Sequence, residues 1–466
     1  MRKRALLASC AVTASLLFTA PLAPSIAAGD AAAKPSRPDI IVILTDDQRV
    51  GTLRWMPNVW RHVVQKGRRY PNAMVPTSLC CPSRASILTG LYAHSTKVWS
   101  NGPGWPAFRD AGMEQRTVAG WLDRAGYRTG LVGKYLNWFR GSSKPPGWHS
   151  WHSFIGSNGS FYDYQLLNTD GSVSSYGSAP SDYSTDVLRR HAVGFLRSTP
   201  PDRPLFLYFA PFAPHAPATP APRDVASPTP LHPFSRPDFN EADVSDKPWW
   251  IRSLPLVPRA RVDDHRVGQY RSLQAVDRAV QAIIEEQRAR SRLRNTLIVV
   301  TSDNGDMWGE HRALGKFLPY DSATRVPLAI RWTKRIVAGR TDPRIALNLD
   351  IPVTIAAAAH APTDPVEGMS LLGAKRRRGF VLEAASARSP GGNGTNVTRP
   401  AYCGWRTIRF LYVRYANGRN EMYDYAKDPF ELTDRHKARS LTDVRRRLRQ
   451  RTRHACVPPP PRYDWR

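Results

Sequence analysis

One run of apolar residues constrains the fold of this chain more than any other feature. Residues 40–44 read Ile-Ile-Val-Ile-Leu and are followed by Thr45, Asp46 and Asp47. A continuous apolar run of this length is typical of a strand buried on both faces, as in a parallel sheet. Such sheets bind ligands beyond the carboxyl ends of their strands, where the two aspartates lie. Adjacent carboxylates repel each other unless a cation neutralises them, so the pair indicates either a cation site or an acidic turn.

Three further runs predict strands that also end in polar residues. They span 128–132, 204–210 and 295–301, and helical stretches lie at 117–125 and 267–288. The longer helix carries one apolar stripe at spacings of three and four residues, formed by Tyr270, Leu273, Val276, Val280 and Ile284. This alternation predicts an α/β fold with a mixed, mainly parallel sheet flanked by helices.

The pattern of apolar and polar residues changes after residue 378. Short strand-like runs and one hairpin turn at Asn417-Gly418 predict a small antiparallel sheet that carries a helix. The runs span 379–384, 406–415 and 421–425, and the helix spans 441–451. We therefore expect a large domain over 37–375 and a small α+β domain over 376–466.

Two segments predict irregular structure. Residues 216–258 are rich in proline and lack periodicity, which indicates a long surface insertion near the site. Residues 389–400 are rich in glycine, proline and asparagine and predict a flexible loop.

The net charge of the chain is strongly positive. Its 67 lysines and arginines outnumber 38 acidic residues, which gives a formal charge of +29. A basic surface attracts any polyanion. No nucleic-acid-binding motif accompanies the charge, so we expect no nucleic-acid partner. The charge indicates either a surface suited to acidic substrates or a bias of composition.

The first 28 residues have the layout of a secretory signal peptide. Arg2, Lys3 and Arg4 precede an apolar stretch over 5–20, and small residues follow up to Ala28. The sequence has no second long apolar run. We therefore expect an exported, soluble protein without a transmembrane segment, from which residues 1–28 are removed.

A cysteine motif carries the strongest functional signal. The sequence Cys80-Cys81-Pro82-Ser83-Arg84 is followed by a short helical run and by Leu-Thr-Gly at 88–90. Proline is tolerated in a first helical turn, so both cysteines should lie at a helix N-terminus, where backbone N–H groups and Arg84 favour an anion. The plain alternative is a buried cysteine pair before an ordinary helix.

This stretch resembles the motif of the formylglycine-dependent sulfatases, and the resemblance runs from about residue 38 to about residue 434. It implies an alkaline-phosphatase-like fold, with 37–375 as the catalytic domain. It also implies that a formylglycine-generating enzyme oxidises Cys80 to the catalytic aldehyde during maturation, with Cys81 in the variable position. The cysteine doublet is similar to that of N-acetylglucosamine-6-sulfatases in particular.

The resemblance also implies a metal site. Its ligands would be Asp46, Asp47, Asp303, Asn304 and the converted Cys80. Oxygen ligands suit Ca²⁺ or Mg²⁺, and the family favours Ca²⁺.

Four basic residues match catalytic and sulfate-binding positions of the family. They are Arg84, Lys134, His215 and Lys316, and His311 is either a fifth member or a structural neighbour. By the family mechanism, one hydroxyl of the hydrated aldehyde attacks sulfur, His215 or Lys316 protonates the departing alcohol, and the second hydroxyl expels sulfate. Many arylsulfatases have a histidine where this chain has Leu136, which leaves open the base of the second step.

The remaining cysteines suggest one disulfide. If Cys80 becomes an aldehyde in an oxidising compartment, Cys403 and Cys456 are the natural pair, although four cysteines allow three pairings.

The resemblance implies hydrolysis of sulfate esters, and we favour a sulfated carbohydrate as substrate. Five tryptophans could stack on sugar rings: Trp138, Trp148, Trp151, Trp249 and Trp250. The alternatives are an arylsulfatase acting on small aryl sulfates, a phosphodiesterase or phosphonate monoester hydrolase on the same scaffold, and a non-catalytic polyanion-binding protein.

Overall fold

The computed structural model describes residues 11, 37–156, 158–390 and 396–465. Residues 37–466 form one compact unit. The signal peptide predicted over 1–28 lies outside the described residues apart from residue 11, so its removal stays a prediction. Among the helices of the described residues, none is both long and apolar enough to span a membrane.

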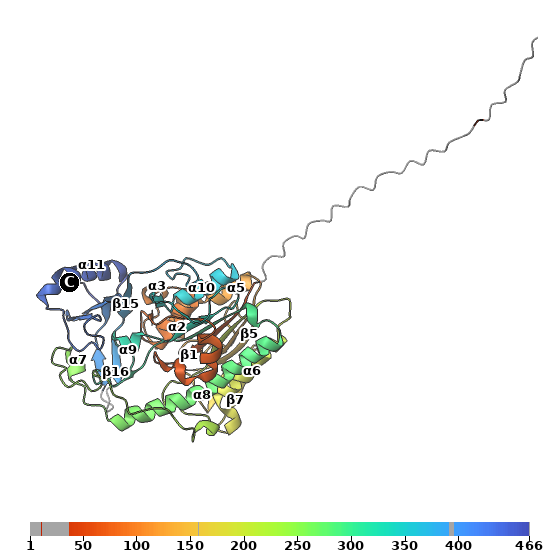
Figure 1. The fold of residues 1–466 in the computed structure, drawn as a ribbon, viewed down its shortest axis with the longest axis horizontal. Coiled ribbons are helices and arrows are strands. Elements are labelled where there is room, and N and C mark those ends of the chain that lie inside the picture. Colours follow the sequence, from red (N-terminus) through yellow and green to blue (C-terminus); the bar gives the residue numbers. More distant parts are fainter. Residues whose placement is uncertain (1–10, 12–36, 157, 391–395, 466) are drawn as a thin grey trace, which may run out of the picture. The chain divides into compact units, whose positions relative to one another are not determined.

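A ten-stranded sheet forms the centre of the molecule (Figure 1). β1 (Asp39–Thr45) lies between β8 (Leu205–Ala210) and β9 (Thr296–Ser302) and is parallel to both. β4 (Arg128–Gly133) continues the parallel part on the far side of β8. All residues of β1, β8 and β9 are buried, as the apolar runs predict.

Shorter strands complete this sheet on both sides. β5 (Ser150–Phe154) is parallel to β4, whereas the outer strands add antiparallel pairs, so the sheet is mixed. The other strands are β6 (Tyr164–Leu167), β7 (Val173–Tyr176), β12 (Leu328–Arg331), β2 (Arg68–Arg69) and β13 (Arg340–Thr341).

Helices cover both faces of the sheet, and β1 shows why. Ile40, Val42 and Leu44 pack into one apolar cluster, whereas Ile41 and Ile43 pack into another. The first cluster includes residues of α2 (Cys80–Thr89), α5 (Val118–Arg124) and α10 (Asp350–Ala359). The second includes residues of α6 (Ser184–Ser198) and α8 (Arg259–Ala289). The predicted layers are therefore confirmed.

The long helix α8 differs from its prediction at one end. It begins at Arg259 instead of at residue 267. The added turns are mostly charged, so they lack the apolar stripe that marked the rest of the helix, but Val262 is buried in a cluster with Phe234 and Trp308. Tertiary packing therefore extends the helix beyond its amphipathic part.

A separate four-stranded antiparallel sheet lies in the C-terminal part, as predicted. Its strands are β15 (Phe380–Ala384), β18 (Tyr402–Arg406), β19 (Phe410–Tyr415) and β20 (Asn420–Asp424), and α11 (Thr442–Ala455) packs on them. The domain boundary at residue 375 stays a prediction.

Two details of this region correct the sequence analysis. The single strand expected over 406–415 is interrupted, because a turn closed by Thr407 N–H and the Phe410 carbonyl separates β18 from β19. The loop expected over 389–400 contains parts of two paired strands, β16 (Ala387–Pro390) and β17 (Asn396–Arg399). Glycine-rich composition marked the connection between these strands but hid their pairing.

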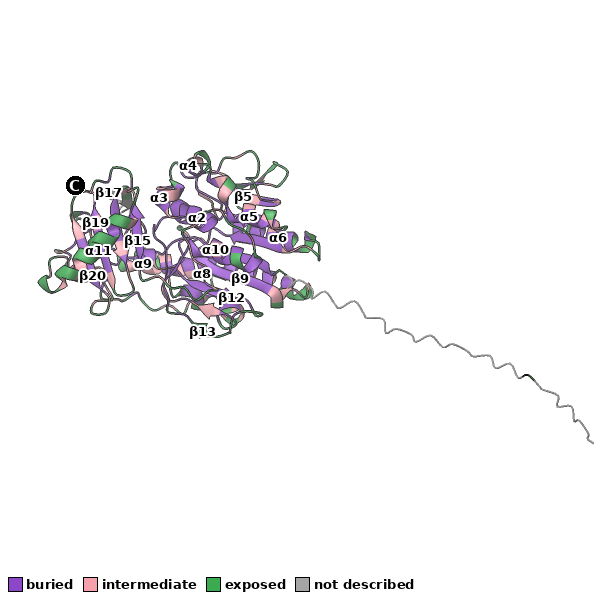
Figure 2. Ribbon diagram, turned by 90° about the horizontal axis from the view of Figure 1, so that it is seen from above, coloured by how far each residue is buried: buried purple, intermediate pink, exposed green. Residues whose placement is uncertain are grey.

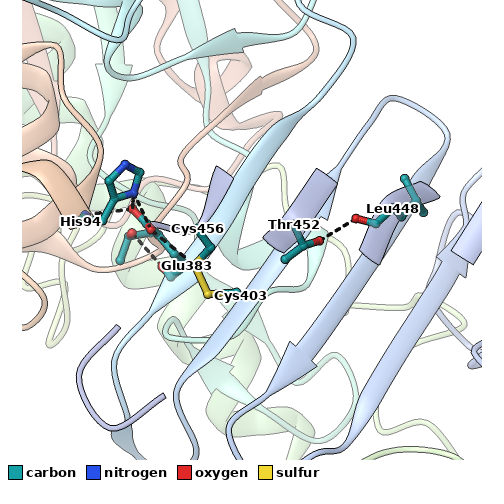
Figure 3. Close-up of a disulfide and its surroundings, with 7 residues drawn as sticks. His94, Glu383, Cys403, Leu448, Thr452 and Cys456 are labelled. Atoms are coloured by element: carbon teal, nitrogen blue, oxygen red, sulfur yellow. Dashed lines mark hydrogen bonds and ion pairs between the residues drawn. A yellow bond between two sulfur atoms is a disulfide. The ribbon is translucent and has the colours of Figure 1, made fainter. Parts of the chain in front are cut away.

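A disulfide ties the end of α11 to this sheet (Figure 3). Cys403 of β18 and Cys456 are bonded, with 6.2 Å between their Cα atoms, which confirms the predicted pair. Cys80 and Cys81 are buried free thiols.

The segment 216–258 is less superficial than predicted. It contains a short helix, α7 (Trp249–Arg252), whose Trp250 is buried against Tyr415 of β19. Lys247 is also buried and donates to the Leu432 carbonyl. The segment therefore packs against the C-terminal sheet. Figure 2 shows that the strands of this sheet, such as β15 and β19, are largely buried beneath α11.

Short elements connect these layers. They are α1 (Pro57–Val59), α3 (Ala93–Thr96), α4 (Trp105–Asp110), α9 (Asp321–Thr324), β3 (Ala73–Met74), β10 (Met307–Trp308), β11 (Leu314–Gly315) and β14 (Ala346–Leu347).

Candidate active site

The four predicted oxygen ligands meet at the carboxyl ends of two adjacent strands. Asp46 and Asp47 follow β1, and Asp303 and Asn304 follow β9. The two strands are parallel, and Thr45 pairs with Ser302, so the four residues emerge side by side. The Asp47 N–H donates to Asp303 Oδ1 at 3.1 Å, and all four residues are buried.

Cys80 is the first residue of α2, and its side chain faces these acids. Its Sγ lies 3.5 Å from Asp46 Oδ1 and 3.9 Å from Asp47 Oδ1. Burial raises the pKa of the Cys80 thiol, although Lys134 and Lys316 act in the opposite direction. Cys81 instead belongs to the apolar cluster beneath the sheet. The structure thus brings Cys80, not Cys81, into the charged group.

Three buried cations, Arg84, Lys134 and Lys316, pair with the carboxylates of Asp46, Asp47 and Asp303. Arg84 donates to Asp303 Oδ2 at 2.8 Å, and its guanidinium lies 3.4 Å from Asp46 Oδ2. Lys134 Nζ lies 2.5 Å from Asp46 Oδ2. Burial alone would raise the pKa of Asp46, but Lys134, His215 and Arg84 lower it to about 2. Asp46 is therefore held ionised.

The backbone before Lys134 requires glycine. Gly133 ends β4 with φ +117°, and a Cβ there would lie 2.1 Å from the Ala210 carbonyl oxygen. The N–H of Lys134 donates to the same carbonyl. This close approach to β8 fixes where the lysine leaves the sheet.

Lys316 comes from the loop after β11. Its Nζ lies 2.5 Å from Asp47 Oδ1 and 2.8 Å from Cys80 Sγ. Two hydrogen bonds join this loop to Ser78, which lies two residues before the start of α2: Phe317 N–H donates to the Ser78 carbonyl, and Ser78 Oγ donates to the Leu318 carbonyl. The nucleophile position and Lys316 are thus fixed relative to each other.

His215 lies at the open side of the group. Its Nε2 is 3.5 Å from Asp47 Oδ2, and its side chain is 18% exposed. The amide of Asn158 approaches the same Nε2 at 3.3 Å, a contact that no sequence pattern indicates. A histidine with this partial exposure can exchange a proton with a bound molecule.

The residues fit a hard divalent cation. Ligand atoms of Asp46, Asp47, Cys80 and His215 all lie within 4.8 Å of one another. Asn304 Oδ1 is buried and lacks a hydrogen-bond partner among the described residues, which is expected of an oxygen that faces a cation. Both Asp303 oxygens accept hydrogen bonds, from Asp47 N–H and from Arg84. The donor set is rich in oxygen, as Ca²⁺ and Mg²⁺ prefer.

Other residues singled out in the sequence lie elsewhere. Leu136 is buried in the apolar cluster. His311 is buried and its Nδ1 lies 2.6 Å from Glu241 Oε2, which favours a structural role. Trp148, Trp151 and Trp250 are core residues, so they cannot stack on a sugar, whereas Trp138 and Trp249 are exposed.

A small pocket of about 220 Å³ borders Asp47. Arg261, His265 and Trp308 contribute to its wall. His265 Nε2 lies 2.9 Å from Asp306 Oδ2, and this carboxylate also accepts from Trp308 Nε1 at 3.0 Å. Arg261 and His265 were not predicted as site residues, because they lie in the first turns of α8, which the apolar stripe did not mark.

Comparisons with known proteins found matching family models, relatives and solved structures. A family model described as Sulfatase matches residues 38–361, and one described as N-sulphoglucosamine sulphohydrolase, C-terminal, matches residues 309–456. An extracellular sulfatase SULF-1 homolog of Drosophila melanogaster is 35% identical over 73% of this chain. The chain spans only 31% of that relative and 49% of a Caenorhabditis elegans relative. The human N-acetylglucosamine-6-sulfatase is 30% identical over 79% of this chain and 70% of its own length.

Solved structures share the fold. One protein in complex with its substrate, D-glucosamine-2-N,6-O-disulfate, has a TM-score of 0.78 at 23% identity and covers 91% of this chain and 98% of its own. A phosphonate monoester hydrolase of Agrobacterium radiobacter has a TM-score of 0.69 at 20% identity, with 90% and 96% covered.

Proposed function

The chain belongs to the sulfatase family, and we propose that it hydrolyses sulfate esters of a carbohydrate with formylglycine at position 80. The observation that carries the proposal is the position of Cys80 between the acids Asp46 and Asp47 and the ammonium group of Lys316. A bare thiol with a raised pKa is a poor nucleophile, which makes an unmodified Cys80 unsuited to attack on sulfur. The hydrated aldehyde would supply one hydroxyl to attack sulfur and a second to release sulfate.

The charges around Cys80 suit a bound sulfate. Asp46, Asp47 and Asp303 balance Arg84, Lys134 and Lys316, so the protein groups alone are close to neutral. A bound divalent cation, for which we propose Ca²⁺, would make the site positive and polarise the sulfate oxygens. We propose Asp46, Asp47, Asp303, Asn304 and residue 80 as its ligands.

The basic side chains have separable roles. We propose that Lys134 and Lys316 contact sulfate oxygens, and that Arg84 orients Asp46 and Asp303 from within the core. His215, which is partly exposed, would donate a proton to the departing alcohol oxygen. With Leu136 buried, Lys134 and His215 are the candidates to take the proton in the second step.

A carbohydrate substrate is supported by relatives and by the pocket. The human relative is named an N-acetylglucosamine-6-sulfatase, and one structural neighbour is bound to a disulfated glucosamine. The pocket beside Asp47 offers Arg261, His265 and the edge of Trp308 to a polar ring. Export through residues 1–28 would bring the enzyme to extracellular glycans, in keeping with the extracellular sulfatases among its relatives.

The test combines mass spectrometry with substrate comparison. Active protein should carry formylglycine at position 80 and an unmodified thiol at Cys81, and Cys80→Ala should abolish turnover with an unchanged fold. Glucosamine 6-sulfate should be hydrolysed with a higher kcat/KM than nitrophenyl sulfate. Because a phosphonate monoester hydrolase shares the fold, an aryl phosphonate should be assayed beside them. Preferred turnover of the phosphonate would reject the sulfatase activity, and preferred turnover of nitrophenyl sulfate would reject the carbohydrate substrate.

A further inference from the structure

A second cleft, far from Cys80, is lined by basic side chains. It measures about 910 Å³ and has seven basic residues in its lining: Arg61, His62, Lys66, Arg288, Arg331, Lys334 and Arg335. None of its lining residues among the described parts of the chain is an aspartate or a glutamate. A volume of this size is within the usual range of ligand sites.

The cleft lies at the opposite end of the sheet from the active site. Arg331 pairs with Ile298 at the end of the ladder between β12 and β9, and Leu293, which precedes β9, is also in the lining. Asp303 lies five residues beyond Ile298 along the chain. At a rise of about 3.3 Å per residue, roughly 17 Å of strand separates the two. The cleft is therefore distinct from the catalytic group.

Three separate elements bring these cations together. Arg61 and His62 lie on the single π-helical turn η2 (Trp60–Val64), Arg288 lies near the end of α8, and Arg331 ends β12. Arg331 is only 8% exposed and donates to the His62 carbonyl at 3.1 Å. The packed core, not a mobile surface chain, thus holds one guanidinium in the cleft.

The described lining of this cleft differs from that of another arginine-rich cleft in having no carboxylate. The other cleft, lined by Arg189, Arg190, Arg223 and Arg278, also contains Asp186, which binds Arg223 at 2.7 Å. In the basic cleft, burial lowers the pKa of His62, and Arg288, Arg331 and Arg61 lower it further, although Glu285, outside the lining, acts in the opposite direction. Burial and Arg288 likewise lower the pKa of Arg331.

Helix dipoles offset only part of this positive charge. The carboxyl ends of η2 and α8 each contribute about half a negative charge. Arginine and lysine side chains in the lining contribute at least five positive charges. The excess is a field that draws in an anion.

We propose that this cleft is a non-catalytic binding site for a sulfated polysaccharide chain. Arginine forks match sulfate and carboxylate groups in pairs. The lining has no Phe, Tyr or Trp, so it lacks the rings on which single-stranded nucleic acids stack, and its concave form suits a chain better than a membrane. The choice of a sulfated ligand rests on the proposed function, but the binding itself needs no turnover.

The experiment measures the affinity of a fluorescent heparin octasaccharide at physiological salt. The variant Arg61→Gln/Lys66→Gln/Arg288→Gln removes three exposed charges from the cleft. The control Arg447→Gln/Arg449→Gln/Arg451→Gln removes three exposed charges from α11. Both are made in Cys80→Ala protein, so that binding is scored whether or not the protein is a sulfatase. Thermal melting checks that each variant is folded.

We expect the cleft variant to lose at least about tenfold in affinity, whereas the control changes by less than about twofold. Equal losses in both variants would show attraction by net charge alone and overturn the proposal. A single-stranded DNA of equal charge, or vesicles of phosphatidylserine, should bind more weakly than heparin and should not distinguish the variants. If either probe binds more tightly than heparin and loses affinity only in the cleft variant, the ligand class is wrong.

Discussion

The ammonium nitrogen of Lys316 lies 2.8 Å from the sulfur of Cys80, although 236 residues separate them in the chain. The same nitrogen lies 2.5 Å from Asp47 Oδ1. Burial alone would lower the pKa of Lys316, but Asp47 and the groups around it raise the pKa well above its ordinary value. Lys316 therefore stays charged across the working pH range, which suits it to bind a sulfate oxygen rather than to act as a base.

Replacement of Lys316 tests this role. Lys316→Gln should lower kcat by about 10²–10³-fold, because one preorganised charge that faces the reacting group is lost. The loop should stay in place, since its bonds to Ser78 come from Phe317 N–H and the Leu318 carbonyl and not from the lysine side chain. Steady-state kinetics would check the rate. A kcat within threefold of the parent protein would contradict the assigned contact.

Removal of one ligand tests the metal site. Asp303→Ala is ambiguous, because it also leaves the buried Arg84 without its partner. Asn304→Ala leaves no buried charge unpaired: the Asn304 Oδ1 has no protein partner among the described residues, and the Nδ2 donates to Asp47 Oδ1 at 2.7 Å, an acid that Lys316 still contacts. We expect this variant to lose bound calcium, measured by elemental analysis, and to lose the thermal shift on chelation. That shift should correspond to about 2.7 kcal/mol when free calcium exceeds Kd by 100-fold.

A matched control exists for this variant. Asn348 is also buried and donates from its Nδ2 to Ser83 Oγ in α2 at 2.8 Å. Asn348→Ala should lower the melting temperature but keep the metal. If both asparagine variants retained calcium equally, Asn304 would not be a ligand.

The sequence predicted those parts of the site that local patterns encode. β1 and β9 were recognisable from apolar runs, and their parallel pairing made Asp46 and Asp303 neighbours. The contacts of His215 with Asn158 and of His265 with Asp306 depend on how distant loops pack, which no short pattern specifies. The prediction that Trp151 could stack on a sugar ring was wrong for a similar reason. Burial depends on the whole fold, and Trp151 is completely buried.

The disulfide should contribute measurably to stability. It joins residues 53 apart, and the loop-entropy relation for that separation gives about 4 kcal/mol, with 2–4 kcal/mol as the usual measured range. Cys403→Ala/Cys456→Ala should therefore unfold at lower denaturant, with the site intact at low temperature. Denaturant unfolding with and without reductant would measure it. Reductant should not affect the double variant, and a stability equal to that of the parent would refute the contribution.

Because of His94, the free energy of unfolding should fall as pH rises into the alkaline range. Its Nδ1 lies 2.8 Å from Glu383 Oε2 (Figure 3). Its Nε2 lies 3.4 Å from Glu367 Oε1. Burial alone would lower the pKa of His94, but hydrogen bonds to Glu367 and Glu383 raise it to about 9. A pKa raised in the folded state stabilises the fold fully below the unfolded value of about 6.5, and the effect is lost as pH rises through about 9.

The comparison is with His94→Gln, which cannot carry the charge. Its destabilisation should be about 1.5–3 kcal/mol at pH 6, as for a hydrogen bond to a charged group, and should shrink toward pH 10. Denaturant midpoints at several pH values would measure the difference. A gap between the two proteins that stays constant from pH 6 to pH 10 would exclude the charged pair.

His265 in the wall of the pocket beside Asp47 should help to select the substrate. His265 is held by Asp306, which raises the pKa of His265 against the effect of burial, so a positive imidazolium faces the pocket at mildly acidic pH. A charged or hydroxylated sugar can use this group, whereas a flat aryl ring gains little from it. His265→Ala should therefore lower kcat/KM for glucosamine 6-sulfate by about tenfold or more, the usual cost of losing a hydrogen bond to a charged group, and leave nitrophenyl sulfate within about twofold. His191→Ala, a partly buried histidine outside the pocket lining, serves as the control. If His265→Ala slowed both substrates equally, His265 would support the site in general and would not select a carbohydrate.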